Sequence, residues 1–233
     1  MATVESYIKK DSWLLLDVDE TLIEFPCALG NKQWRDEAKF FLKKRNLEGQ
    51  FDLLYYEIAI RVPVISVQLE TPEIIKNFQA KSDFVWGFTA RGANEWCTTH
   101  IEGIDLLTED QLASVDIHLS KILYTSHVKK GEFLKNALNE WKIRPALIVV
   151  VDDKKDQVAS VEKAMKEMDI PFIGIWYRRT EKNNKNQLPL IGHYQMDQVF
   201  LHDRILSDDE ALKELSPLNN ETYFNEIFDQ ISL

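Results

Sequence analysis

The sequence predicts an α/β fold: a doubly wound, Rossmann-like parallel sheet with helices on both faces, a small helical cap insert and a helical C-terminal tail. Three observations favour this fold. Short apolar runs recur along the chain, and they are continuous rather than alternating, as in parallel strands that are buried on both faces. Helical patterns separate these runs. Several charged and hydroxyl side chains follow directly after them, and ligands of open α/β sheets bind at that end of the strands.

Five apolar runs are expected to form the strands of the sheet, at residues 13–17, 84–88, 122–126, 146–152 and 172–177. Helices are expected between them, at residues 71–81, 130–142 and 157–168. Thr71 is a candidate N-cap of the first of these helices, with Pro72 at its first position. The core of the protein is therefore expected to comprise residues 1–24 and 71–179.

Two regions lie outside this alternation. Residues 25–70 carry a helical pattern and a second apolar stretch, and we expect them to form a small cap insert. Residues 180–233 are expected to be a helical extension that packs on the core, with helices near 208–215 and 220–231. Ser207 and Glu210 have the spacing of a capping box at the start of the first of these helices.

The composition narrows the classes of function. A net charge of −10 argues against nucleic acid or an anionic membrane surface as the main partner. Two cysteines suggest neither a disulfide framework nor a zinc site. The longest apolar run, residues 146–151, is too short to be a transmembrane segment, and the first residues do not resemble a signal peptide. The default expectation is a cytoplasmic protein, and export by a route independent of a signal peptide stays open as the alternative.

The candidate site residues follow separate predicted strands. Asp17 and Asp19 come after the first strand, Thr89 after the second, and Lys130 opens the helix after the third. Asp152 and Asp153 follow the fourth. Each of these patterns is common alone, but their combination predicts one site at the carboxyl edge of the sheet, because buried carboxylates need a cation or a chemical role there.

These residues carry a family resemblance. The segments "DVDETL", "TAR", "KKG" and "VVVDD" resemble motifs one to four of the haloacid dehalogenase-like (HAD) hydrolases, over residues 10–178. The second Asp of the first motif is typical of the phosphatase branch. The contexts "GFTAR" and "VVVDDKK" also resemble an uncharacterised HAD group from intracellular bacteria, which favours an exported protein.

The resemblance implies a role for each residue. Asp17 would be the nucleophile and Asp19 the general acid and base, while Thr89 and Lys130 would bind the phosphoryl oxygens. Mg²⁺ would be held by the side chains of Asp17 and Asp153 and by the main-chain carbonyl of Asp19. Lys129 is the alternative to Lys130.

Three further residues have open roles. Asp152 is expected either to orient the lysine or metal-bound water, or to cap a helix. Ala90 would contribute a backbone N–H to the phosphoryl group. Arg91 would contact a substrate anion or form a surface ion pair. Thr21 is expected to fix the turn of the first motif, and neither Cys27 nor His127 is given a catalytic role.

The predicted function is that of a magnesium-dependent phosphomonoesterase that forms an aspartyl-phosphate. The alternatives are a phosphatase or phosphomutase of a small metabolite and a catalytically idle binding module. The partner would be a phosphorylated protein side chain or small molecule. The insert is rich in aromatic residues, which either stack on an aryl phosphate such as phosphotyrosine or form the insert's own core; they are Phe25, Trp34, Phe40, Phe41, Tyr55 and Tyr56.

Overall fold

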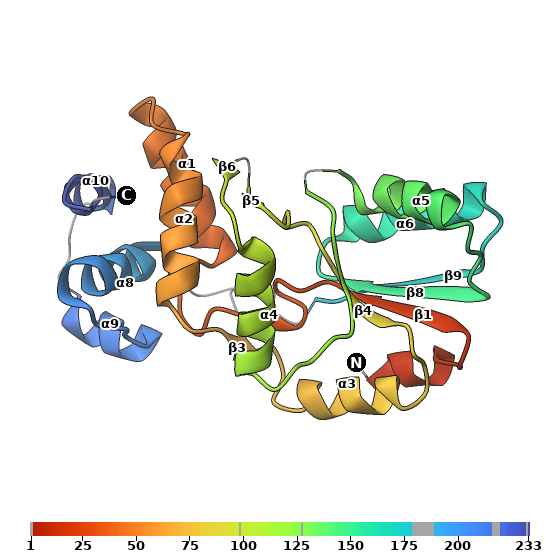
Figure 1. Ribbon diagram of the computed structural model, residues 1–233. Helices are drawn as coiled ribbons and strands as arrows, with labels where there is room; N and C mark the ends of the chain where they lie inside the picture. Colours follow the sequence, from red (N-terminus) through yellow and green to blue (C-terminus); the bar gives the residue numbers. More distant parts are fainter. Residues whose placement is uncertain (1, 98, 127, 179–188, 216–219, 232) are drawn as a thin grey trace. The chain divides into compact units, whose positions relative to one another are not determined.

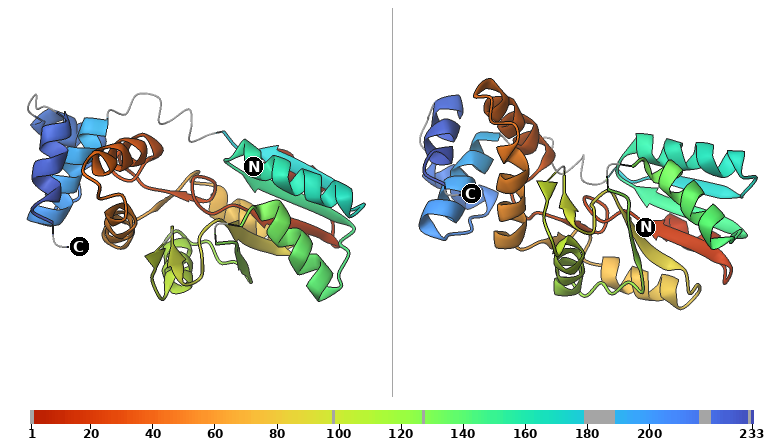
Figure 2. Two further views of the ribbon diagram at one scale, coloured as in Figure 1. Left: turned by 90° about the horizontal axis from the view of Figure 1, so that it is seen from above. Right: turned by 45° about the horizontal axis from the view of Figure 1, so that its top comes forward.

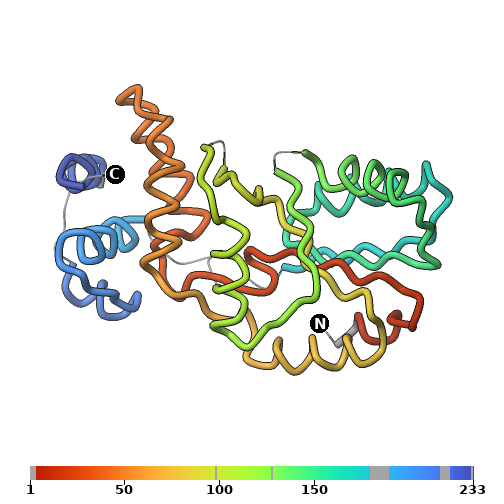
Figure 3. The backbone as a smooth tube through the Cα atoms, viewed as in Figure 1, coloured from red at the N-terminus to blue at the C-terminus, as the bar shows by residue number. Residues whose placement is uncertain are grey.

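The computed structural model describes residues 2–97, 99–126, 128–178, 189–215, 220–231 and 233. The chain forms two compact units, and each is described by itself. The first consists of residues 1–24 and 66–180, and the second of residues 25–65 and 181–233. Figure 3 follows the backbone out of the first unit after β1 (Ser12–Leu16), through α1 (Lys32–Lys44) and α2 (Gln50–Arg61), and back to α3 (Thr71–Gln79).

A five-stranded parallel sheet is the centre of the first unit. Its strand order is β7-β4-β1-β8-β9, and every neighbouring pair is parallel (Figure 1). Strand β1 lies in the middle and is buried along its whole length. The other strands are β4 (Val85–Thr89), β7 (Ile122–Tyr124), β8 (Leu147–Asp152) and β9 (Phe172–Trp176). The predicted doubly wound α/β fold is confirmed, and all five expected strands form.

Helices cover both faces of this sheet. α5 (Lys130–Trp141) and α6 (Lys155–Glu167) lie side by side on one face, and α3 lies on the other (Figure 2). Alternate residues of the central strands, Trp13 and Leu15 among them, pack against Leu134 of α5 and Met165 of α6. The apolar runs of the sequence are continuous because successive residues point to opposite faces and both faces are buried.

Several short elements complete the first unit. They are a 3₁₀ helix (Ala2–Tyr7), α4 (Ile104–Ser114), the pair β2 (Ile23–Glu24) and β3 (Ile65–Ser66) at the start and end of the insert, and the hairpin β5 (Glu95–Trp96) and β6 (Thr99–His100). The sequence did not predict this hairpin. The expected cap of α3 was also wrong: Glu70 occupies the N-cap position, and Thr71 is the first helical residue.

The C-terminal extension, which we expected to pack on the core, forms one compact unit with the insert. Helices α8 (Pro189–His202) and α10 (Asn220–Phe228) pack against α1, and α9 (Asp208–Glu214) packs against α8. His193 of α8 is fully buried, with its ring near those of Trp34, Phe41 and Phe224. Buried residues of the extension, Phe224 among them, therefore cover apolar residues of the insert.

The same packing decides between the two interpretations of the insert's aromatic residues. Trp34, Phe41 and Tyr55 are buried within the second unit, whereas Phe40 is exposed. The ring of Trp34 lies near that of Phe51, at a tilt, and Phe51 stacks on Tyr55. These buried rings form the insert's own core.

The capping box of Ser207 and Glu210 forms as predicted.

Within the described residues, no helix has both the length and the apolar character that a membrane crossing requires.

We predict that Gly131→Ala destabilises the first unit. A Cβ atom at Gly131 would lie 2.0 Å from the backbone oxygen of Ser160, so α5 and α6 would have to separate. Overpacking of this kind typically costs about 1–3 kcal/mol, which exceeds the gain in helix propensity of roughly 0.5–1 kcal/mol. Thermal unfolding should show a lowered Tm. Gly49→Ala is the control, because no atom lies within 4 Å of a Cβ there; equal Tm values for the two variants would contradict the account.

Candidate active site

The candidate residues meet at the carboxyl edge of the parallel sheet. Asp17 follows β1, and its backbone N–H donates to the carbonyl of Val151 in β8 at 2.9 Å. Asp152 is the last residue of β8, and Thr89 is the last residue of β4. Because β1 lies between β4 and β8, the sheet alone brings these side chains to one edge.

Lys130 joins two of the acids. Its Nζ donates to Oδ1 of Asp17 at 2.7 Å and to Oδ2 of Asp152 at 2.5 Å. The lysine is 1% exposed and is the first residue of α5. Burial alone would lower the pKa of Lys130, but the charges of Asp17 and Asp152 outweigh it and raise the pKa. The ammonium therefore stays charged and compensates the buried carboxylates.

Asp153 completes a cluster of three acids. One ligand atom each of Asp17, Asp152 and Asp153 lies within 4.8 Å of the others. Oδ1 of Asp153 is buried and accepts no hydrogen bond. Burial, together with the charge of Asp17, raises the pKa of Asp153 to about 9. Burial and the same charge raise the pKa of Asp152 to about 6, against the opposing effect of Lys130.

This arrangement fits a hard divalent cation. Such cations prefer carboxylate oxygens, and a positive charge beside Asp153 would favour its ionised form and so oppose the rise of its pKa. Asp17 has a second oxygen, Oδ2, besides the one that contacts Lys130, and Oδ1 of Asp153 lacks a donor. These two oxygens would hold the ion.

Asp152 combines both of its expected roles. Its Oδ2 binds Lys130, and its Oδ1 accepts a hydrogen bond at 2.8 Å from the backbone N–H of Lys154, the N-cap residue of α6. Since both oxygens are engaged, Asp152 is better suited to position Lys130 than to bind a cation.

Asp19 lies outside the acidic cluster. Its two carboxylate oxygens accept hydrogen bonds from Arg91, at 2.7 Å from Nη2 and 2.9 Å from Nε. Arg91 is 8% exposed, so the expectation of a surface ion pair was wrong. Its Nη1 donates to Thr108 and Gln111 of α4. Nothing in the sequence indicated this anchoring, because Thr108 and Gln111 lie 17 and 20 residues away along the chain.

Thr89 and Ala90 occupy the turn that leads to Arg91. Thr89 is fully buried, and its Oγ1 accepts a hydrogen bond at 3.1 Å from the backbone N–H of Arg91. Ala90 is exposed. Trp96 of the unpredicted hairpin lies near Arg91, with the guanidinium carbon 5.0 Å from the ring centroid.

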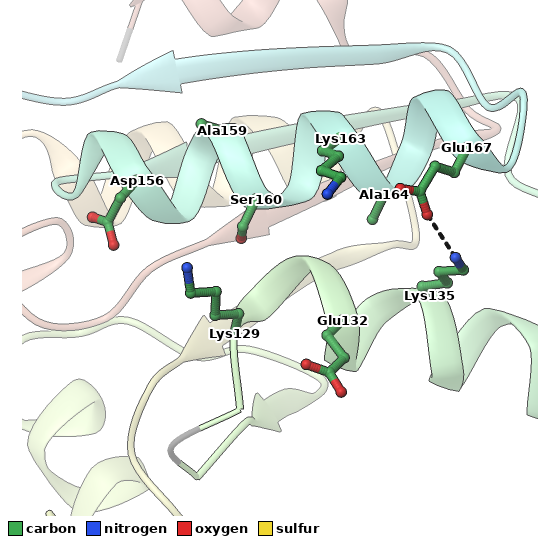
Figure 4. Close-up of a pocket in the computed structure, with 9 residues that line it drawn as sticks. All are labelled: Lys129, Glu132, Lys135, Asp156, Ala159, Ser160, Lys163, Ala164 and Glu167. Carbon is green, nitrogen blue, oxygen red and sulfur yellow. Dashed lines mark hydrogen bonds and ion pairs between the residues drawn. The ribbon is translucent and has the colours of Figure 1, made fainter.

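Lys129 points elsewhere. It lines a surface groove between α5 and α6, and Figure 4 shows its ammonium directed toward α6 near Asp156 and Ser160. An ion pair between Lys135 and Glu167 crosses the far part of this groove at 2.6 Å. Lys130 is therefore the lysine that meets the acids, and Lys129 is not needed as its replacement.

The remaining sequence candidates have no place in the chemistry. Thr21 is buried, and its hydroxyl has no hydrogen-bond partner, so the expectation that it fixes the turn was wrong; backbone bonds from Leu22 and Ile23 to Val18 close the turn instead. Burial raises the pKa of the Cys27 thiol to about 12, which makes it a poor nucleophile. His127 lies outside the described residues.

A residue that the sequence did not suggest supports Asp153. Nε1 of Trp176 donates to the main-chain carbonyl of Asp153 at 2.8 Å. Trp176 follows from the register of the sheet, since it pairs with Asp152 across β8 and β9. A cross-strand neighbour of this kind cannot be identified before the strand order is known.

Comparison with known proteins identifies relatives but no activity. The sequence profile of the family described as "Protein of unknown function (DUF2608)" matches residues 1–122 and 108–212. A protein of Chlamydia trachomatis named "Putative outer membrane protein" is 24% identical over 90% of this chain and 84% of its own length. A protein of Chlamydia muridarum with the same name is 23% identical over 88% of this chain and 82% of its own length. No solved structure matches the chain.

We predict that the stability of the metal-free protein falls as pH rises. The folded pKa values of Asp153, about 9, and Asp152, about 6, exceed the ordinary value near 3.8. The folded state therefore binds more protons than the unfolded state above about pH 4, and the stabilisation is lost as pH rises to about 9. Thermal unfolding should give a Tm that declines between pH 5 and pH 9, and less steeply in Asp153→Asn.

Added Mg²⁺ should act in the opposite direction. It must displace the proton of Asp153, so it should raise Tm more at pH 8 than at pH 5, by an amount corresponding to about 2.7 kcal/mol at 100 times its Kd. Asp153→Asn should lose most of this effect. A Tm that is insensitive to Mg²⁺ at every pH would contradict the fit of a cation to this cluster.

Proposed function

The chain belongs to the family described as "Protein of unknown function (DUF2608)", whose description assigns no activity, and we propose one from the site: hydrolysis of phosphomonoesters with a divalent cation, through an aspartyl-phosphate on Asp17. The observation that carries the proposal is the cluster of Asp17, Asp152 and Asp153 with the buried ammonium of Lys130. The resemblance of its four sequence motifs to the HAD phosphatases supports the same reaction.

Asp17 is suited to be the nucleophile. It is 5% exposed, and contact with Lys130 fixes the orientation of its carboxylate. In the first step an Asp17 oxygen forms a bond to phosphorus while the bond from phosphorus to the leaving oxygen breaks. Asp19, which lies two residues on, gives a proton to the leaving alkoxide or phenoxide.

The second step regenerates the enzyme. Asp19 takes a proton from a water molecule, whose oxygen attacks phosphorus. The bond between phosphorus and Asp17 breaks, which releases inorganic phosphate and the Asp17 carboxylate. Acid–base help of this kind typically contributes roughly 10²–10⁴-fold in rate.

The surrounding groups would compensate the negative charge of the phosphoryl oxygens and of the nucleophile. A Mg²⁺ ion held by Asp17 and Asp153 would neutralise the phosphoryl oxygens and so reduce their repulsion of an anionic nucleophile. Lys130 holds a second positive charge at the same carboxylate, and Asp152 keeps it there. Thr89 and the backbone N–H of Ala90 would bind phosphoryl oxygens.

Two alternatives use the same residues. In a phosphomutase or phosphotransferase, the aspartyl-phosphate passes to a sugar hydroxyl instead of water. In an idle binding module, the cluster binds a phosphate without turnover. Intact acids and an intact lysine favour an active enzyme over the idle module, because uncompensated buried carboxylates are costly to keep without a role.

The identity of the substrate is a separate and more specific proposal. Phosphotyrosine or another aryl phosphate is one candidate, since a phenol is a better leaving group than an alcohol. The buried aromatic residues of the insert give this candidate no support, because Trp34, Phe41 and Tyr55 pack within their own unit. A small phosphorylated metabolite is the other candidate.

The cellular compartment of the protein is also a matter of proposal. The Chlamydia relatives are named "Putative outer membrane protein", and these names favour export over the cytoplasmic default. Fractionation of cells that express the chain would decide between the two compartments.

We predict magnesium-dependent hydrolysis of p-nitrophenyl phosphate, and its loss in Asp17→Asn. This change removes the nucleophile and one ligand charge, so kcat should fall by at least about 10⁴-fold. Asp156→Asn is the control, because it makes the same charge change at an exposed residue nearby and should retain activity within about twofold. The proposal fails if folded protein shows no turnover with Mg²⁺, Mn²⁺ or Co²⁺ between pH 5 and pH 8.

We predict that the damage from Asp19→Asn depends on the leaving group. Alkyl phosphates need a proton on the departing oxygen and should lose roughly 10²–10⁴-fold in kcat/KM, whereas p-nitrophenyl phosphate should lose much less. The measurement is the slope of log kcat/KM against leaving-group pKa in both proteins. An unchanged slope would exclude Asp19 as the general acid.

A further inference from the structure

The pairing of Asp19 with Arg91 conflicts with the chemistry proposed for Asp19. Both oxygens of the carboxylate accept hydrogen bonds from the guanidinium, one from Nη2 and one from Nε. A general acid must carry its proton on one carboxylate oxygen and turn that oxygen toward the leaving group, but both oxygens of Asp19 face the donors of the guanidinium. Asp19 must therefore release at least one of these bonds before it can act.

Arg91 is the fixed partner of this pair. Its Nη1 donates at 3.0 Å to Thr108 and at 2.8 Å to Gln111, and both residues are buried in α4. Trp96 lies beside the guanidinium. The Arg91 side chain is 7% exposed, whereas the Asp19 side chain is 35% exposed. When the pair opens, Asp19 is the residue that moves.

Simple release of Asp19 is unfavourable. It withdraws two charge-assisted hydrogen bonds from a guanidinium that remains buried, and such bonds are about twice as strong as neutral ones. The cost disappears if another planar oxyanion takes the place of Asp19. The Nε and Nη2 edge of an arginine matches the two oxygens of a carboxylate in both spacing and plane.

We propose that Arg91 is a positioning residue that holds Asp19 away from the acidic cluster until a carboxylate of the substrate takes its place. The substrate class is thus a phosphomonoester that also carries a carboxylate. The inference rests on the proposed phosphatase activity. In this scheme the carboxylate of the substrate both binds to Arg91 and sets the general acid free.

The test uses substrate pairs that share the type of leaving oxygen, an alcohol or a phenol, and differ in one carboxylate. O-phosphoserine is compared with O-phosphoethanolamine, and O-phosphotyrosine with O-phosphotyramine. At least one pair should show a preference of roughly tenfold or more in kcat/KM for the carboxylate form. The serine pair should differ in kcat as well as in KM, because an alcohol needs the released acid.

Variants of Arg91 test whether this residue causes the preference for the carboxylate form. In Arg91→Gln the ratio within the pair should fall to about one. In Arg91→Lys it should fall partway, since an ammonium keeps the charge but cannot bind both oxygens in one plane. Arg144→Gln is the control, because this exposed arginine bonds to the main chain of Met168 and Asp169 and should leave the ratio unchanged. Circular dichroism and thermal unfolding check that each variant folds.

Binding of these compounds to an inactive variant tests the inference independently of turnover. In Asp17→Asn, calorimetric titration should show tighter binding of the carboxylate form of the preferred pair, and Arg91→Gln added to that variant should remove the difference. Two results would overturn the inference and leave the phosphatase proposal standing. One is a kcat/KM ratio near one for both pairs in the active wild-type protein. The other is a preference for the carboxylate form that persists in folded Arg91→Gln. A wild-type protein that hydrolyses none of the four compounds, nor p-nitrophenyl phosphate, would overturn both.

Discussion

The contact of the Lys130 ammonium with two carboxylates is the interaction on which the candidate site depends. Asp17 and Asp152 are both buried, and buried carboxylates are costly without a compensating charge. The contact ties α5 to the sheet, because Lys130 is the first residue of α5 and its side chain reaches the ends of β1 and β8. Gly131 then explains how α5 comes so close to α6: any larger residue would meet the backbone of Ser160.

Lys130 leaves one member of the cluster uncompensated. Its ammonium contacts Asp17 and Asp152, while the pKa of Asp153 is raised to about 9 by burial and by the charge of Asp17. A site that was only structural would gain stability from an apolar or neutral residue at this position. A third acid beside a charged lysine is understandable if a cation binds to Asp17 and Asp153, and this is the reason for proposing metal-dependent chemistry.

The sequence predicted those parts of the site that depend on local rules. Continuous apolar runs identified the strands, and residues at their carboxyl ends meet because the sheet is parallel. The partners of Arg91 could not be predicted, since Thr108 and Gln111 belong to a helix whose position depends on tertiary packing. The association of the C-terminal extension with the insert could not be predicted for a similar reason: an apolar stripe indicates that a helix is buried, but not which surface buries it.

The central claim is that Asp17 becomes phosphorylated during turnover. Protein quenched with acid during hydrolysis of p-nitrophenyl phosphate can be treated with borohydride, which reduces an acyl phosphate to an alcohol, and then digested for mass spectrometry. The account predicts homoserine in place of aspartate at position 17, and no such change in Asp17→Asn or in protein incubated without substrate. A reduced residue at another position, or turnover without any reduced aspartate, would contradict it.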